Sequence, residues 1–163
     1  MVMSGRRIAV LGLGNPILKD DAVGLKVIEE LDRILTAEPH PGVELLTSQR
    51  AGFEVIDRLS GYDEVIIVDA FQAPDTRPGR IRQVEMSQIS GSARLMSVHE
   101  IGLEAAFELA RTLDIPMPGR VSIIGIEADD VYEFGEEMSP DVAAAVGPVV
   151  EDIIARLRKR NTP

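Results

Sequence analysis

Four residues of this chain combine the chemistry of metal ligands with positions at the ends of expected strands or the starts of expected helices. Asp20 and Asp21 are adjacent and follow a glycine-rich turn after the first apolar run. Asp69 directly follows a second apolar run, and His99 precedes an apolar helical pattern. In a parallel sheet, residues that follow the strands meet at the carboxyl edge, where ligands bind. Two aspartates and one histidine would offer two oxygen ligands and one nitrogen, a set that suits zinc or nickel and leaves coordination positions open.

Each of these residues also has a simpler structural interpretation. One of Asp20 and Asp21 is expected to cap the helix that follows, because aspartate is a preferred N-cap and negative charge is favoured at that end. Asp69 fits a turn in which its carboxylate bonds its own backbone. A lone histidine at a helix start is more often structural than a ligand. The metal interpretation therefore depends on these side chains converging on one edge.

The turn Gly12-Leu-Gly14 resembles the start of a dinucleotide-binding fingerprint. The third glycine is missing, because position 17 is Ile. Acids at positions 20 and 21 would oppose a pyrophosphate at the helix start. We reject a nucleotide site here and assign Gly12 and Gly14 to the geometry of a tight turn.

Apolar runs alternate with helical patterns along the chain. Strands are expected at Arg6–Leu13, Val43–Thr47, Glu64–Ala70, Gly79–Val84 and Arg120–Ile126. Helices are expected at Ala22–Leu35, Gly52–Leu59, Glu100–Leu113 and Pro140–Arg158. The fourth strand follows the third after a short turn, so this pair is expected to be antiparallel. The pattern predicts a three-layer α/β/α sandwich with a mixed, mostly parallel sheet of about five strands, in a single domain over residues 1–163.

Three further segments carry separate expectations. Pro148 falls inside the last helical pattern and is expected to kink or split that helix. Met86–Val98 is expected to be a long loop. The basic stretch Arg156 to Arg160 is expected to complement the carboxyl end of the last helix.

Composition narrows the classes of protein. Lys and Arg total 17 against 27 Asp and Glu, for a net charge of −10, which argues against nucleic acid or an anionic membrane as a partner. The chain has no cysteine, which excludes disulfides, cysteine nucleophiles and thiolate zinc sites. No apolar run approaches a membrane span and no signal-peptide core follows the first residues, so we expect a cytoplasmic protein. No serine lies in a Gly-x-Ser-x-Gly elbow, which disfavours a serine hydrolase.

An acidic segment follows the last expected strand. Its carboxylates are Glu127, Asp129, Asp130, Glu133, Glu136 and Glu137. Such a run is usually solvated surface. The alternative is that it recognises a basic segment of a partner.

The motifs together resemble those of the hydrogenase maturation endopeptidases. The matching segments are Gly12-Leu-Gly-Asn-Pro-Ile-Leu-Lys-Asp-Asp-Ala-Val-Gly24, Ile66-Ile-Val-Asp-Ala70, Ser97-Val-His-Glu-Ile-Gly-Leu103, Gly125-Ile-Glu127 and Met138-Ser-Pro-Asp-Val142. They span nearly the whole chain in the right order.

This resemblance implies an endopeptidase that removes a C-terminal extension from the large-subunit precursor of a nickel–iron hydrogenase after nickel insertion. It implies Asp21, Asp69 and His99 as the residues that recognise or use nickel. It also implies that the precursor supplies the nickel and that zinc or another divalent ion can substitute for it. The residues expected to shape the turn or orient these ligands are Asp20, Gly12, Gly14, Asn15 and Glu100.

One segment departs from the family. A Gly-Thr-x-Gly-like turn often follows the second strand, but Thr47-Ser-Gln-Arg-Ala-Gly52 keeps only the last glycine. We therefore expect Arg50 and Gly52 to contact the substrate, with Arg50 reading a different extension.

Two other functions remain open from the sequence. Peptidyl-tRNA hydrolases also begin with a Gly-Leu-Gly-Asn-Pro turn, but they need a basic channel that this chain lacks. A non-catalytic nickel-sensing maturation chaperone would need only the same three ligands. The endopeptidase and the chaperone differ in whether a nickel-loaded precursor is shortened.

Overall fold

The structure is a computed structural model that describes residues 5–49, 53–85 and 100–160. Five strands form one sheet in the order β2-β1-β3-β5-β4. The strands are β1 (Ile8–Leu13), β2 (Val43–Ser48), β3 (Glu64–Phe71), β4 (Ile81–Glu85) and β5 (Arg120–Glu127). The helices are the 3-10 turn η1 (Asp20–Ala22), α1 (Val23–Ala37), α2 (Phe53–Leu59), α4 (Glu100–Thr112) and α5 (Pro140–Arg160).

The sheet is mixed, as the sequence predicts. β1 pairs in parallel with β2 and β3, and β3 pairs in parallel with β5. β4 pairs antiparallel with β5, because the short connection from β3 cannot make a parallel crossover. The carboxyl ends of β1, β2, β3 and β5 therefore share one edge, which we call the carboxyl edge.

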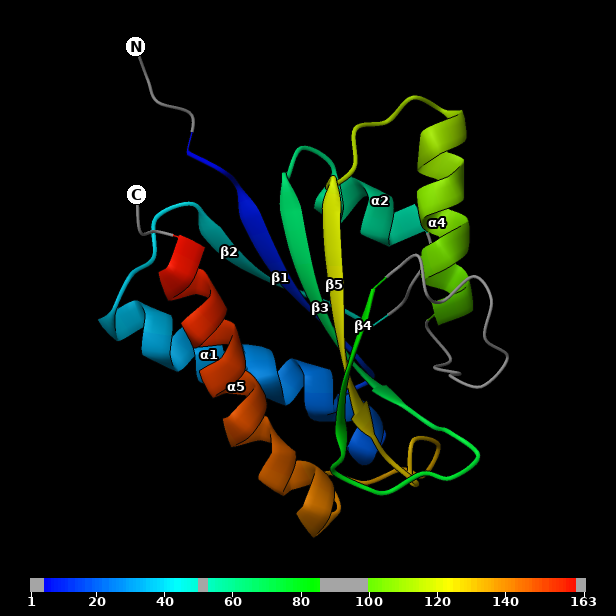
Figure 1. Cartoon of the computed structure of the whole chain (residues 1–163). Coiled ribbons are helices and arrows are strands. Elements are labelled where there is room, and N and C mark those ends of the chain that lie inside the picture. The colour runs from blue at the N-terminus through cyan, green and yellow to red at the C-terminus, as the bar shows by residue number, and fades with distance from the viewer. Residues whose placement is uncertain (1–4, 50–52, 86–99, 161–163) are drawn as a thin grey trace.

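Helices cover both faces of the sheet, so the three-layer prediction is confirmed (Figure 1). On one face, alternate residues of the central strands, such as Val10, Ile66 and Ile124, pack with residues of α1 and α5. On the other face, their neighbours, such as Leu11 and Ile67, pack with residues of α2 and α4. β3 is buried along its whole length, which explains why its sequence is continuously apolar rather than alternating.

The structure adds detail to two expectations about the last helix. Pro148 does not split α5, which runs unbroken from Pro140 to Arg160. Residues on both sides of it, including Ala145, Val149 and Ile153, are buried in the core, and this packing offsets the backbone hydrogen bond that proline cannot make. At the helix end, Arg160 pairs with the fully buried Glu64 of β3 at 2.5 Å, so it does more than complement the helix dipole. The expected loop Met86–Val98 lies outside the described residues.

The backbones of β1 and α1 approach each other closely. A Cβ atom built on Gly24 would collide with the carbonyl oxygens of Leu13 and Val68, and one on Gly12 would collide with the carbonyl oxygen of Gly24. Because the colliding atoms are backbone atoms, they cannot move aside as a flexible side chain can. The start of α1 is therefore held against the ends of β1 and β3.

We predict that Gly24→Ala lowers the free energy of unfolding by about 2 to 3 kcal/mol, because the new methyl group overpacks a backbone contact. Chemical denaturation measures this change. Gly147→Ala in α5 is the matched control, since a Cβ there meets nothing within 4 Å. We expect it to change the free energy of unfolding by less than about 1 kcal/mol, because two effects oppose each other. Alanine has a higher helix propensity than glycine, but a residue with a Cβ is disfavoured in the helical conformation directly before a proline. Equal effects of the two substitutions would contradict the close approach.

Candidate functional site

Two carboxylates, Asp21 and Asp69, are buried at the carboxyl edge. Asp21 lies in η1 and is 5% exposed, and Asp69 lies near the end of β3 and is 4% exposed. η1 contacts β3 directly. Burial of a charged carboxylate is costly unless other groups compensate it, so two such groups on contacting elements mark this part of the edge as a candidate site.

The turn after β1 sets the direction of Asp21. The Asn15 amide donates to Asp21 Oδ2 at 2.9 Å, and the Ile17 amide donates to Asn15 Oδ1 at 3.2 Å. Gly14 has φ +156°, and a Cβ on it would collide with the Asp21 carbonyl oxygen. The turn thus needs glycine at this position, and its backbone supplies a hydrogen bond that holds the carboxylate.

Asp20 faces a different partner. Its carboxylate is fully buried and accepts hydrogen bonds from the Ser139 amide at 2.7 Å and from the Ser139 hydroxyl at 2.6 Å. Ser139 directly precedes α5, so Asp20 joins η1 to the start of the last helix. The expectation that one of the paired aspartates caps its own helix is wrong: neither η1 nor α1 has a side-chain cap, and the N-cap of α1 is Ala22. Both the amide and the hydroxyl of Ser139 are engaged in this contact.

Strand alternation assigns Asp69 to one face of the sheet. Val65 and Ile67 pack with α2 and α4, so Asp69, two residues on, belongs to the same face. α4 leads through a short connection into the amino end of β5, and its own amino end therefore points to the carboxyl edge (Figure 1). Asp69 and the beginning of α4 share one face and one edge.

Other predicted site residues fall at the limits of the described structure. His99, Arg50 and Gly52 lie outside the described residues. Glu100 is the first residue of α4. Among the residues that the structure does describe, no group of three or more His, Cys, Asp or Glu side chains could hold a metal ion; the predicted set has only two members there.

Glu127 is a buried acid that sequence reasoning assigned to a solvated segment. It is fully buried at the end of β5 and accepts hydrogen bonds from Arg80 Nε and the Arg77 amide, both at 2.7 Å, and from Arg82 Nε. Burial alone would raise the pKa of the Glu127 carboxyl, but these hydrogen bonds outweigh it and hold the pKa below its ordinary value. The signal that sequence analysis missed was a pair of arginines, Arg82 in β4 and Arg80 just before it, which the antiparallel pairing brings to the end of β5.

We predict that Glu127→Gln lowers the free energy of unfolding at neutral pH by about 2 kcal/mol, because hydrogen bonds to a charged group are lost. The folded-state pKa of Glu127 lies below its unfolded value, so its stabilisation is complete above the ordinary glutamate pKa. The stabilisation disappears as the pH falls through the lower folded-state pKa. Denaturation at a series of pH values should therefore show wild type and variant converging in acid. Glu151→Gln, on the exposed side of α5, should have no such effect; a constant difference down to low pH would contradict the assignment.

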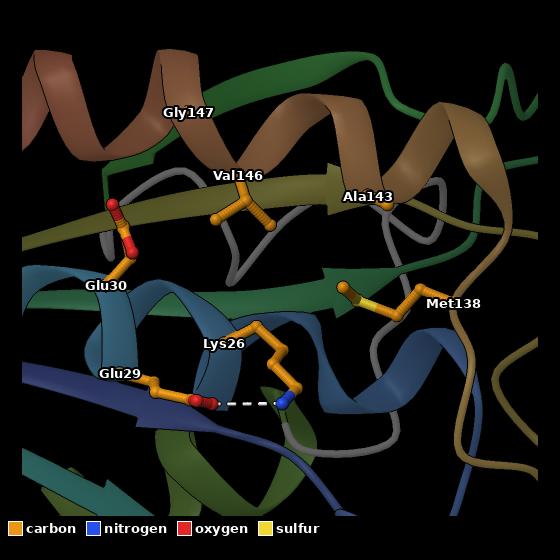
Figure 2. A pocket seen from close by; sticks show the side chains of 7 residues that line it. All are labelled: Lys26, Glu29, Glu30, Met138, Ala143, Val146 and Gly147. Carbon is orange, nitrogen blue, oxygen red and sulfur yellow. Dashed lines mark hydrogen bonds and ion pairs between the residues drawn. The ribbon is translucent and has the colours of Figure 1, made fainter.

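A pocket of about 390 Å³ lies away from these acids, between α1 and α5 (Figure 2). Met138, Ala143 and Val146 form its apolar part. Lys26 and Glu29 at its rim bond each other at 2.9 Å. Neither Asp21 nor Asp69 lines it, so the pocket is separate from the candidate site.

In the described part of the chain, no helix is both long and apolar enough to cross a membrane.

Comparison with known proteins identifies the class as a protease. The sequence model of the hydrogenase maturation protease family, HycI, matches residues 25–156. The chain therefore belongs to the hydrogenase maturation protease family and is a hydrolase.

Individual relatives agree with this assignment. The chain is 27% identical over 154 residues to the hydrogenase 2 maturation protease of Escherichia coli strain K12, covering 94% of this chain and 92% of the relative. Among solved structures, it resembles the hydrogenase maturating endopeptidase HybD from E. coli, with a TM-score of 0.77, 26% identity and coverage of 95% and 94% of the two chains. It also resembles the [NiFe] hydrogenase maturation protease HybD from Thermococcus kodakarensis, with a TM-score of 0.74, 27% identity and coverage of 93% and 99%.

Proposed function

We propose that this chain is an endopeptidase that processes a hydrogenase large-subunit precursor, removing its C-terminal extension after nickel has been inserted. Asp21, Asp69 and His99 would recognise the nickel ion carried by the precursor. The observation that carries the proposal is the pair of buried carboxylates, Asp21 and Asp69, at one edge of the sheet. The family membership supports the processing reaction. The proposal includes the cytoplasm as the place of this reaction.

His99 is the histidine that suits this edge. The chain contains two histidines, His40 and His99. His40 lies between the end of α1 and the start of β2, hence at the opposite edge of the sheet, where its ring Nδ1 lies 3.0 Å from the Glu38 carbonyl oxygen. His99 precedes in sequence the first residue of α4, whose amino end points to the carboxyl edge on the face of Asp69. A nitrogen ligand from this chain would therefore come from His99.

The donor set fits an ion that is shared with another protein. Two carboxylates and one imidazole would leave coordination positions for ligands of the precursor, and nickel, zinc or another divalent ion accepts oxygen and nitrogen donors. A bound ion can polarise a scissile carbonyl or activate water. The Asn15 amide would keep the Asp21 carboxylate oriented, while Asp20 would hold η1 to α5.

A non-catalytic nickel-sensing chaperone is the alternative that the same three ligands would permit, and membership of a protease family disfavours it. A peptidyl-tRNA hydrolase is disfavoured by the same membership and by the net charge of −10.

The test is to incubate the purified chain with nickel-loaded and with nickel-free precursor and to measure the mass of the large subunit. We expect the nickel-loaded precursor to lose a C-terminal fragment and the nickel-free precursor to stay intact. His99→Ala and Asp69→Asn should slow processing by about a hundredfold or more, because each removes or weakens a ligand.

His40→Ala is the matched histidine control and should process at the wild-type rate. Thermal unfolding of each variant checks that the fold is retained. Full processing by His99→Ala would refute the metal assignment, and equal cleavage of the nickel-free precursor would refute recognition of nickel. If neither precursor is shortened while both bind the chain, the chaperone alternative is favoured.

A further inference from the structure

Two loops at the carboxyl edge pair with each other beside the candidate site. We call residues 15–19 and 129–137 the paired loops. Leu18 and Phe134 form an antiparallel bridge, the Gly135 amide donates to the Ile17 carbonyl, and the Lys19 amide donates to the Glu133 carbonyl, both at 3.0 Å. Figure 1 shows the connection between β5 and α5 beside the start of α1. The pairing makes one continuous surface from segments far apart in the sequence.

The paired loops expose large apolar side chains. Ile17 is 56% exposed, Tyr132 65% and Phe134 73%. The described residues include only three other exposed large hydrophobic side chains, Phe53, Ile81 and Leu113, and these belong to separate elements. Large exposed apolar groups gathered on adjoining segments favour an interaction surface, whereas scattered ones need no explanation.

The same surface carries excess negative charge. Lys19 is the one basic residue of the paired loops, against Asp129, Asp130, Glu133, Glu136 and Glu137. Lys19 forms ion pairs with Glu133 at 2.8 Å and Asp130 at 3.3 Å. Within the part of the chain that the structure describes, no ion pair joins Asp129, Glu136 or Glu137 to another residue, and all three are exposed. This surface is therefore complementary to a segment that is both basic and apolar.

The paired loops continue directly into the candidate site. Lys19 is followed by Asp20 and Asp21, and the Asp20 amide donates to the Asp130 carbonyl at 3.1 Å. A polypeptide lying across Ile17 and Phe134 would thus pass next to η1. This continuity favours the protein substrate, rather than an unrelated partner, as the occupant.

We propose that the paired loops are the docking surface for the precursor, and that they bind a segment of it in which lysine or arginine side chains lie beside apolar ones. The aromatic rings of Tyr132 and Phe134 cover the apolar groups and can also accept a cation on their faces. Glu136, Glu137 and Asp129 attract the basic groups. This inference rests on the proposed function, since it names the surface by which the same substrate is held.

The test measures binding and processing of the nickel-loaded precursor separately. We expect the double variant Tyr132→Ser/Phe134→Ser to weaken binding of fluorescently labelled precursor and to raise KM by about tenfold. The kcat should stay within about twofold of wild type, because the lost contacts are made with a part of the substrate that is remote from the scissile bond. Leu113→Ser is the matched control, since Leu113 is 57% exposed at the far end of α4. It should leave both values unchanged.

The charge is tested with Glu136→Lys/Glu137→Lys. We expect a higher KM at low salt and a weaker dependence of KM on salt than in wild type, because salt screens the attraction between exposed charges. Glu151→Lys on the exposed side of α5 is the control with the same reversal of charge. Thermal unfolding of every variant verifies that the fold is retained.

The outcomes separate this inference from the proposed function. Wild-type values of binding and KM in both double variants would overturn docking at the paired loops, even if the precursor is processed. A lower kcat at unchanged KM would also overturn it. A change from dimer to monomer in sedimentation, with binding unchanged, would make the surface a self-association interface instead. If the wild-type chain shortens no precursor, the proposed function fails, and the binding measurement still decides whether these loops hold the large subunit.

Discussion

The contact between the glycine turn and the start of α1 is the constraint on which the candidate site depends. Gly12 and Gly24 let the backbones of β1, β3 and α1 touch, and Gly14 lets the turn lie against the Asp21 carbonyl. Side chains at these positions would push η1 off the sheet. With η1 held in place, its two acids diverge: the amide of Asn15 holds Asp21, whereas Asp20 reaches Ser139 at the start of α5. One short turn therefore both orients a candidate ligand and joins η1 to the start of the last helix.

The carboxyl edge unites features that are distant in the sequence. Buried Asp69 shares the face of α2 and α4, and Glu127 ends the neighbouring strand under Arg80 and Arg82. The connection from β5 to α5 returns to pair with the turn after β1. A protein substrate that meets this edge would contact a buried pair of carboxylates and an exposed aromatic and acidic surface together. Both features would then act on the same bound polypeptide.

Sequence patterns predicted the sheet and its helices because local signals agree with the tertiary structure there. Val65 to Val68 is apolar on both faces, and α1 repeats its apolar residues at helical spacing. The prediction failed where distant contacts decide. The expected split at Pro148 does not occur, because core packing fixes the residues on both sides of it. Asp20 bonds Ser139, 119 positions away, instead of capping its helix. Glu127 can be buried because Arg80, just before β4, and Arg82, within it, bond its carboxylate. No short-range pattern contains these partners.

The central claim is that Asp21, Asp69 and His99 meet around one ion. A crystal structure of the chain soaked with zinc or cadmium, located by its anomalous scattering, tests it most directly. The account predicts one ion bound by these three side chains, with ligand distances near ~2 Å for zinc. An ion bound elsewhere, with Asp21 or Asp69 more than roughly 8 Å from the His99 ring, would contradict a common site at such distances.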